Sequence, residues 1–176
     1  MFRKSLGIPI YLLLCCLFSN QIHASAGIDE RKRQAGHPAT STEQLWKMAK
    51  DADWQVRQVL ASNRRSPAAL LHALATDPYP QVRIAVATNL ATEERSFMIL
   101  AKDKDIEVRR VVARFEYVPE KALALLALDK EAGIREEVVR NLNTSSETLI
   151  LLSQDADPEI ANIAEQVLAQ RKEENR

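Results

Sequence analysis

Carboxylate and guanidinium side chains recur along this chain at one fixed spacing. Successive aspartates lie 26 residues apart, and an arginine follows each of the first four by six residues. The aspartates are Asp51, Asp77, Asp103, Asp129 and Asp155, and the arginines are Arg57, Arg83, Arg109 and Arg135. Carboxylates act as general acids or bases, as metal ligands or as ion-pair partners. Because a reaction needs one constellation and not five copies, the repetition favours a structural ladder of Asp–Arg pairs.

Each repeated Asp is predicted to cap the start of a helix by accepting bonds from backbone N–H groups. The Arg that follows, one and a half turns on, could then reach the Asp of its own unit or of an adjacent one. Such charge-assisted bonds contribute about 1.5–3 kcal/mol when partly desolvated, and exposed pairs contribute about 0–1 kcal/mol. The sequence leaves open which unit each Arg contacts.

Apolar columns keep the same spacing, so residues 43–169 are five copies of one unit. In the second copy, residues 71–75 form one helical stripe and residues 82–89 a second. A single unit buries too little apolar surface to offset about 1–2 kcal/mol of backbone entropy per ordered residue. The sequence therefore predicts an all-α fold, an α-solenoid built as a superhelical stack of five 26-residue two-helix repeats.

The repeat also resembles a known family. LATDPYPQVRIAVATN, at residues 74–89, is in register with LAKDKDIEVRRVVARF and MAKDADWQVRQVLASN, and together they resemble the leucine-rich repeat variant, which is close to HEAT repeats. The resemblance implies a right-handed superhelical stack of short helices that is used mainly as a binding surface. Some relatives carry a cysteine-bound iron–sulfur cluster, which the mature chain expected here, without Cys15 and Cys16, cannot hold.

An Asn column closes three of the five units, at Asn63, Asn89 and Asn141, whereas Phe115 and Val167 replace it in the others. This position follows the second helix, where a left-handed residue or a turn-forming side chain is useful. We interpret the column as structural.

The amino end has the order of an export signal. Basic residues precede the short apolar run at 6–18, and Ala24 and Ala26 form a small-x-small cleavage site. Residues 1–26 are therefore predicted to be a secretory signal peptide, cut after Ala26. The run is shorter than the roughly 20 apolar residues of a membrane helix, and an uncleaved anchor is the alternative.

Two polar segments flank the repeats. Residues 27–42 lack apolar periodicity and are predicted to be a flexible linker, and residues 170–176 a fraying polar tail. The whole chain carries 24 Lys and Arg residues against 24 Asp and Glu residues, so no basic field for nucleic acid is expected. The mature chain keeps two histidines and has neither a metal-ligand cluster nor a phosphate loop. No catalytic residue, metal site or cofactor is predicted.

Columns that vary between units are the candidates for binding a partner, since the scaffold accounts for the repeated ones. On the second helices these are Gln58, Ile84, Arg110 and Glu136, and beside them Ser62, Thr88, Arg114 and Arg140. The three arginines, Arg110, Arg114 and Arg140, could form a basic strip in the middle of the stack. An ordinary solvated helix face is the alternative.

The first helices become apolar toward the C-terminus. Residues 122–129 and 148–155 are apolar nearly all round, which predicts inner helices of a curved stack that are buried on several sides. The alternative is an exposed patch for a partner or for self-association through the first helices of units 4 and 5.

The sequence thus predicts an exported scaffold, periplasmic or secreted, which is not an enzyme and binds an unidentified protein of the cell envelope. A HEAT-like solenoid that binds nucleic acid through the basic strip is one alternative, and an enzyme of unrecognised type is another.

Overall fold

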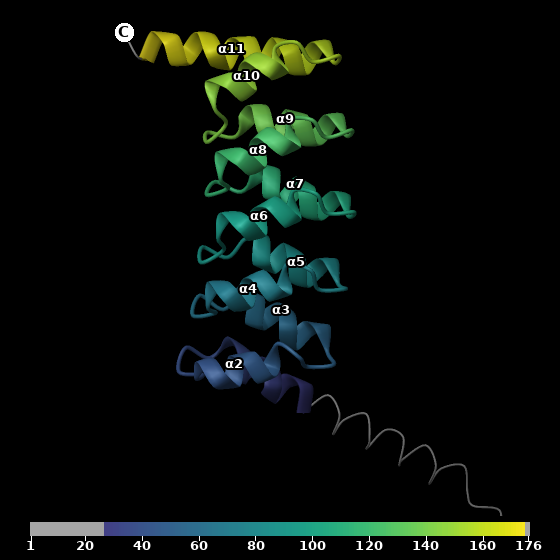
Figure 1. Cartoon of the computed structure of the whole chain (residues 1–176), viewed down its shortest axis with the longest axis vertical. Helices are drawn as coiled ribbons and strands as arrows, with labels where there is room; N and C mark the ends of the chain where they lie inside the picture. The colour runs from purple at the N-terminus through teal and green to yellow at the C-terminus, as the bar shows by residue number, and fades with distance from the viewer. Residues whose placement is uncertain (1–26, 175–176) are drawn as a thin grey trace, which may run out of the picture.

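Pairs of short helices stack along one axis in the computed structural model, which describes residues 27–174 (Figure 1). The pairs are α2 (Thr42–Met48) with α3 (Trp54–Ser62), α4 (Ala68–Leu74) with α5 (Pro80–Ala87), α6 (Glu94–Leu100) with α7 (Ile106–Arg114), α8 (Glu120–Leu126) with α9 (Ala132–Arg140), and α10 (Ser146–Leu152) with α11 (Pro158–Glu174). No strand occurs among the described residues. The predicted all-α solenoid of two-helix repeats is confirmed.

The two helices of each unit form two layers of the stack. The second helices α3, α5, α7, α9 and α11 pack on one another in succession, and the first helices lie along their side (Figure 1). Wholly buried Val82 and Val86 are spaced by one turn on α5, as the apolar columns require. Ala61, Ala87 and Ala113 are also wholly buried, and their small side chains allow the second helices to approach closely.

The turn between the two helices of a unit is held by the repeated Asp, which lies two residues before the N-cap. Asp77 Oδ1 accepts the N–H of Tyr79, the N-cap of α5, at 2.9 Å. The same bond recurs at Asp51, Asp103, Asp129 and Asp155. The predicted capping role is therefore corrected. An Asp placed before the cap forms a side-chain turn and keeps its carboxylate free for another donor.

Residues 27–36 are helical, which corrects the prediction of a flexible linker over 27–42. Ala35 in this helix is wholly buried, and its carbonyl accepts a bond from Asn63 Nδ2 at 2.7 Å. The segment is ordered by the unit that follows it, and so it needs no apolar stripe of its own.

This helix takes the place of a second helix in a preceding unit, of which the structure describes this half. Arg31 lies 26 residues before Arg57, and its Nε contacts Asp51 Oδ2 at 2.8 Å. Thr40 Oγ1 donates to Gln34 O at 2.6 Å, a bond that the later units repeat. Polar residues occupy the apolar columns in this half unit, as a terminal repeat requires. A search for apolar periodicity therefore misses it.

The other end of the stack is closed by α11. It is longer than the other second helices and packs along α10 (Figure 1). Because it continues to Glu174, the tail predicted at 170–176 is helical over its described part. Ala161 stands in the Arg column, and exposed Glu165 stands in the column of buried Ala and Val residues. This unit therefore lacks the groups that would hold a further repeat.

The predicted signal peptide at 1–26 lies outside the described residues. Within 27–174, no helix is long and apolar enough to cross a membrane.

Overpacking the half unit tests its place in the stack. Ala35→Leu is expected to lower the free energy of unfolding by about 1–3 kcal/mol, because the wholly buried site has no room for a larger side chain. Urea unfolding followed by circular dichroism measures the change. Ala39→Leu, at an exposed position of the same segment, is the matched control. Equal stability of the two variants would contradict a packed half unit.

Candidate partner-binding surface

Each repeated Arg joins its own unit to the next one. Arg57 Nε donates to Asp77 Oδ2 at 2.6 Å, and Arg57 Nη2 donates to Asp77 Oδ1 at 3.0 Å. The third nitrogen, Nη1, donates to Asp51 O at 2.6 Å within the first unit. The same fork joins Arg83 to Asp103, Arg109 to Asp129 and Arg135 to Asp155. The choice left open by the sequence is settled: the carboxylate belongs to the following unit.

Burial makes these ion pairs strong determinants of the stack. Arg83, which pairs with Asp103, is 4% exposed, and Asp77, which pairs with Arg57, is 7% exposed. The bond from Arg135 lowers the pKa of Asp155 against the opposing effect of burial. Burial alone would raise the pKa of Asp129, but the bonds it accepts from Arg109 and from the backbone lower it overall. No buried side-chain nitrogen or oxygen in the described part of the chain lacks a partner.

A second ladder runs through the Asn column. Asn89 Nδ2 donates to Ala61 O at 2.6 Å and to Asn63 O at 3.0 Å, both in the preceding unit. Its Oδ1 accepts the N–H of Ala91, which forms a side-chain turn. No non-glycine residue in 27–174 has a positive φ, so the expectation of a left-handed residue is wrong and the turn-forming alternative holds.

Repeated hydroxyl groups form a third column that the sequence analysis missed. Ser66 Oγ and Thr144 Oγ1 donate to the carbonyl six residues earlier, at 2.6 Å and 2.5 Å, and both side chains are buried. Thr92 makes the same bond to Val86 O. A hydroxyl at the 26-residue spacing was the signal that could have revealed it.

In the third unit the Asn and hydroxyl columns hold Phe115 and Val118, and Phe115 belongs to an aromatic cluster. Phe115 stands in the Asn column and stacks on Phe97, with ring centroids 6.0 Å apart. Tyr117 meets Phe115 edge-on at 5.7 Å and is 60% exposed. Asn143 of the next unit donates to Glu116 O at 2.6 Å, so a polar bond still crosses this boundary.

The candidate positions on the second helices carry charges that neutralise one another. Gln58, Ile84, Arg110 and Glu136 are half-buried, and Ser62, Thr88, Arg114 and Arg140 are exposed. Arg110 pairs with Glu107, Arg114 with Glu137 at 3.6 Å, and Arg140 with Glu136 at 2.7 Å. The three arginines lie on this face, but each has a carboxylate partner there. This arrangement is a solvated helix face of mixed charge.

The first helices of units 4 and 5 are covered on one side only, which corrects their description as inner helices buried on several sides. Leu126 and Leu149 are wholly buried against the second helices. On the opposite side, Leu128 is 70% exposed, Ile150 53% and Leu151 46%. Helical periodicity marks both sides as apolar, but the stack supplies a covering layer for only one of them.

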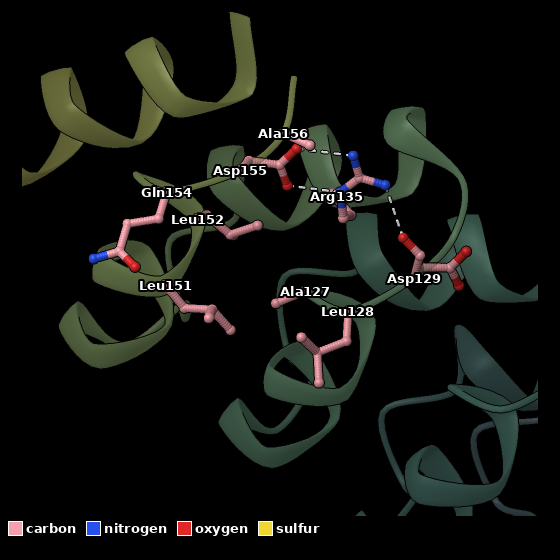
Figure 2. Close-up of a pocket in the computed structure, with 9 residues that line it drawn as sticks. All are labelled: Ala127, Leu128, Asp129, Arg135, Leu151, Leu152, Gln154, Asp155 and Ala156. Atoms are coloured by element: carbon pink, nitrogen blue, oxygen red, sulfur yellow. Dashed lines mark hydrogen bonds and ion pairs between the residues drawn. The ribbon is translucent and has the colours of Figure 1, made fainter. Parts of the chain in front are cut away.

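Hollows open between successive turns on this side of the stack. One, of about 370 Å³, lies between the turns that follow α8 and α10 and is lined by Leu128, Leu151 and Gln154. The ion pair of Arg135 and Asp155 forms its polar wall (Figure 2). A second, of about 310 Å³, lies two units earlier and is lined by Thr76, Pro78, Ile99, Lys102 and Lys104, with Arg83 and Asp103.

One pair of side chains has the composition of a catalytic dyad. His72 Nδ1 lies 3.1 Å from Ser96 Oγ, across α4 and α6. Ser96 is wholly buried, so no substrate reaches its hydroxyl, and the bond ties two first helices together. No group of three potential metal ligands occurs within the described stretch.

The stack of two-helix units is similar to a solved structure. A structure described as a leucine-rich repeat variant with a novel repetitive structural motif superposes with a TM-score of 0.59 at 31% sequence identity. This chain is similar to that leucine-rich repeat variant in repeat fold and in sequence. The match covers 74% of this chain and 52% of the other, so this chain spans about half the length of the variant it matches. No protein-family model matches the chain, and a search of curated proteins finds no match.

Breaking the Asp–Arg ladder should destabilise the solenoid strongly. Asp103→Ala leaves the guanidinium of Arg83, 4% exposed, without its carboxylate, and is expected to cost about 3–5 kcal/mol of unfolding free energy. Glu107→Ala, which removes an exposed pair with Arg110, should cost no more than about 1 kcal/mol. Thermal melting of the two variants measures the difference. Equal melting temperatures would remove the ladder as a source of stability.

The ladder also predicts sensitivity to acid. The pKa of Asp155 is lowered in the folded chain, so its contribution to stability is present above the unfolded pKa of about 3.9 and is lost as pH falls through the folded value. Urea unfolding from pH 7 to pH 2 should show stability falling below about pH 4. Asp155→Asn should be less stable at neutral pH and lose less on acidification. Glu165→Gln, on the exposed face of α11, should follow the parent curve.

Proposed function

We propose that this chain is an exported scaffold, without catalysis of its own, that binds another protein of the cell envelope. One observation carries the proposal: the repeated side chains hold the units together, whereas the columns that vary lie half-buried or exposed on the surface of the same stack. A surface of this kind offers one rigid platform with a different side chain at each step.

Export is supported by the order of residues at 1–26: basic residues, an apolar run and a small-x-small site. Cleavage after Ala26 would retain residues 27–36, the helical part of the half unit that the structure describes. The mature chain would then contain no Cys. Its stability in an oxidising compartment would come from the two ladders and the core, with no disulfide.

Nucleic acid is not part of the proposal. Arg110, Arg114 and Arg140 each face a carboxylate on the same surface, and a phosphate would have to displace it. We propose no catalytic role, because the repeated acids and bases hold the units together and Ser96 is buried beside His72.

Fractionation and site-specific crosslinking test this function. A C-terminally tagged full-length chain, expressed in its native cells, is expected in the envelope fraction with Gly27 at its N-terminus. A photoreactive residue in place of Leu151 or of Arg140 samples the first-helix and second-helix faces in turn. Capture of one defined protein, identified by mass spectrometry, supports the proposal. Retention of residues 1–26 in the cytoplasm, or no specific product from either position, would contradict it.

A further inference from the structure

The first helices carry an aliphatic column beside their buried residues, and most of its surface is exposed. It contains Ala73, Ile99, Leu125 and Leu151, one residue per unit from the second to the fifth. Ile99 is 36% exposed and Leu151 46%, and Leu128, 70% exposed, lies beside them in the fourth unit. We call these five residues the apolar stripe. Its residues are exposed except Leu125, which is half-buried and packs partly against the core.

The stripe borders the two hollows, which gives it places for a partner's side chains. Ile99 lines the hollow between units 2 and 3, and Leu128 and Leu151 line the one between units 4 and 5. Figure 2 shows the side chains of Leu128, in the turn after α8, and Leu151, on α10, at the same opening. An apolar side chain inserted there would contact both leucines.

Two lysines place positive charge at the hollow between units 2 and 3. Lys102 and Lys104 both line it and are both exposed. Neither amine forms an ion pair within residues 27–174, whereas Arg110, Arg114 and Arg140 on the second helices are each paired with a Glu. The charge at this hollow is complementary to a carboxylate.

The spacing of the stripe distinguishes between partner conformations. Successive second helices pack on one another, and packed helices lie about 8–10 Å apart, so we expect the stripe to repeat at about that step. An α-helix returns to the same face after seven residues, or about 10.5 Å. A β-strand returns every two residues, about 6.6–6.8 Å, which does not fit. Polyproline II advances about 9.3 Å per turn, but the grooves that bind it are lined by aromatic rings, and this stripe is aliphatic.

Taking the proposed function as its basis, we propose that the apolar stripe binds an amphipathic α-helix of the partner protein. The helix lays apolar side chains of heptad spacing along Ile99, Leu125 and Leu151. It carries acidic residues toward Lys102 and Lys104. The binding face is therefore that of the first helices.

A displayed library of random peptides tests the proposal. The peptides are about 21 residues long, or three heptads, and they are selected for binding to the chain from residue 27 onward. Peptides selected on residues 27–176 are expected to share apolar residues at i, i+3 or i+4 and i+7, with net negative charge. The double variant Leu128→Ser/Leu151→Ser should weaken their binding about tenfold or more. Lys102→Glu/Lys104→Glu should weaken it by a similar factor, and added salt should weaken binding to the parent.

Leu142→Ser is the matched control, since Leu142 is 90% exposed in the turn between α9 and α10 and lies outside the stripe. It should bind the peptides as the parent does. Selected peptides without helical periodicity, or binding that survives both double variants, would overturn the proposal. Sedimentation of the parent as a dimer that Leu128→Ser/Leu151→Ser dissociates would also overturn it, by assigning the stripe to a second copy.

The two proposals can fail separately. A specific crosslink from position 140 with none from position 151 would leave a scaffold that binds a partner, but through its second helices. In that case the proposed function stands and the stripe is not the binding face. Absence of any specific crosslink, with peptides still bound at the stripe, would contradict the envelope partner and retain the helix-binding face.

Discussion

A guanidinium buried between two units is the interaction on which the rest of this structure depends. Each repeated Arg donates to a backbone carbonyl of its own unit and, through two nitrogens, to the carboxylate of the next. The two-point fork fixes the orientation of one unit on the next as well as their separation. Because the pair is buried, removing either partner leaves an uncompensated charge. The fork recurs at each boundary between units, and so it makes the stack rigid along its length.

The ladder also explains how the stack ends. Arg31 supplies the first guanidinium from a half unit whose other columns are polar. In the last described unit, Ala161 and Glu165 replace the Arg and the buried small residue, so α11 carries neither of these cohesive groups. The repeated polar residues thus hold successive units together, and the other surfaces of the helices remain available to bind a partner. The second-helix face carries paired charges, while the first-helix face keeps exposed leucines.

Much of this architecture could be predicted because one spacing governs every column. An insertion-free period of 26 residues marks the unit, and two helical stripes within it require two helices. The half unit at 27–36 was missed because its apolar columns are polar, although Arg31 and Ala35 keep the register. The hydroxyl column at Ser66 was missed for a related reason: Ser and Thr are common in turns, and only the bond to the carbonyl six residues earlier reveals the role.

The sequence by itself determined the repeat, the two helices per unit and the residue types of both ladders, since these are local or periodic properties. Only the tertiary structure decided that Arg57 binds the Asp of the following unit, because both carboxylates are compatible with the length of the side chain. It also decided which apolar residues are covered. Helical periodicity states that Leu151 and Leu152 are both apolar, but burial is a relation between neighbours, and a single stack has a neighbour on only one side of its first helices.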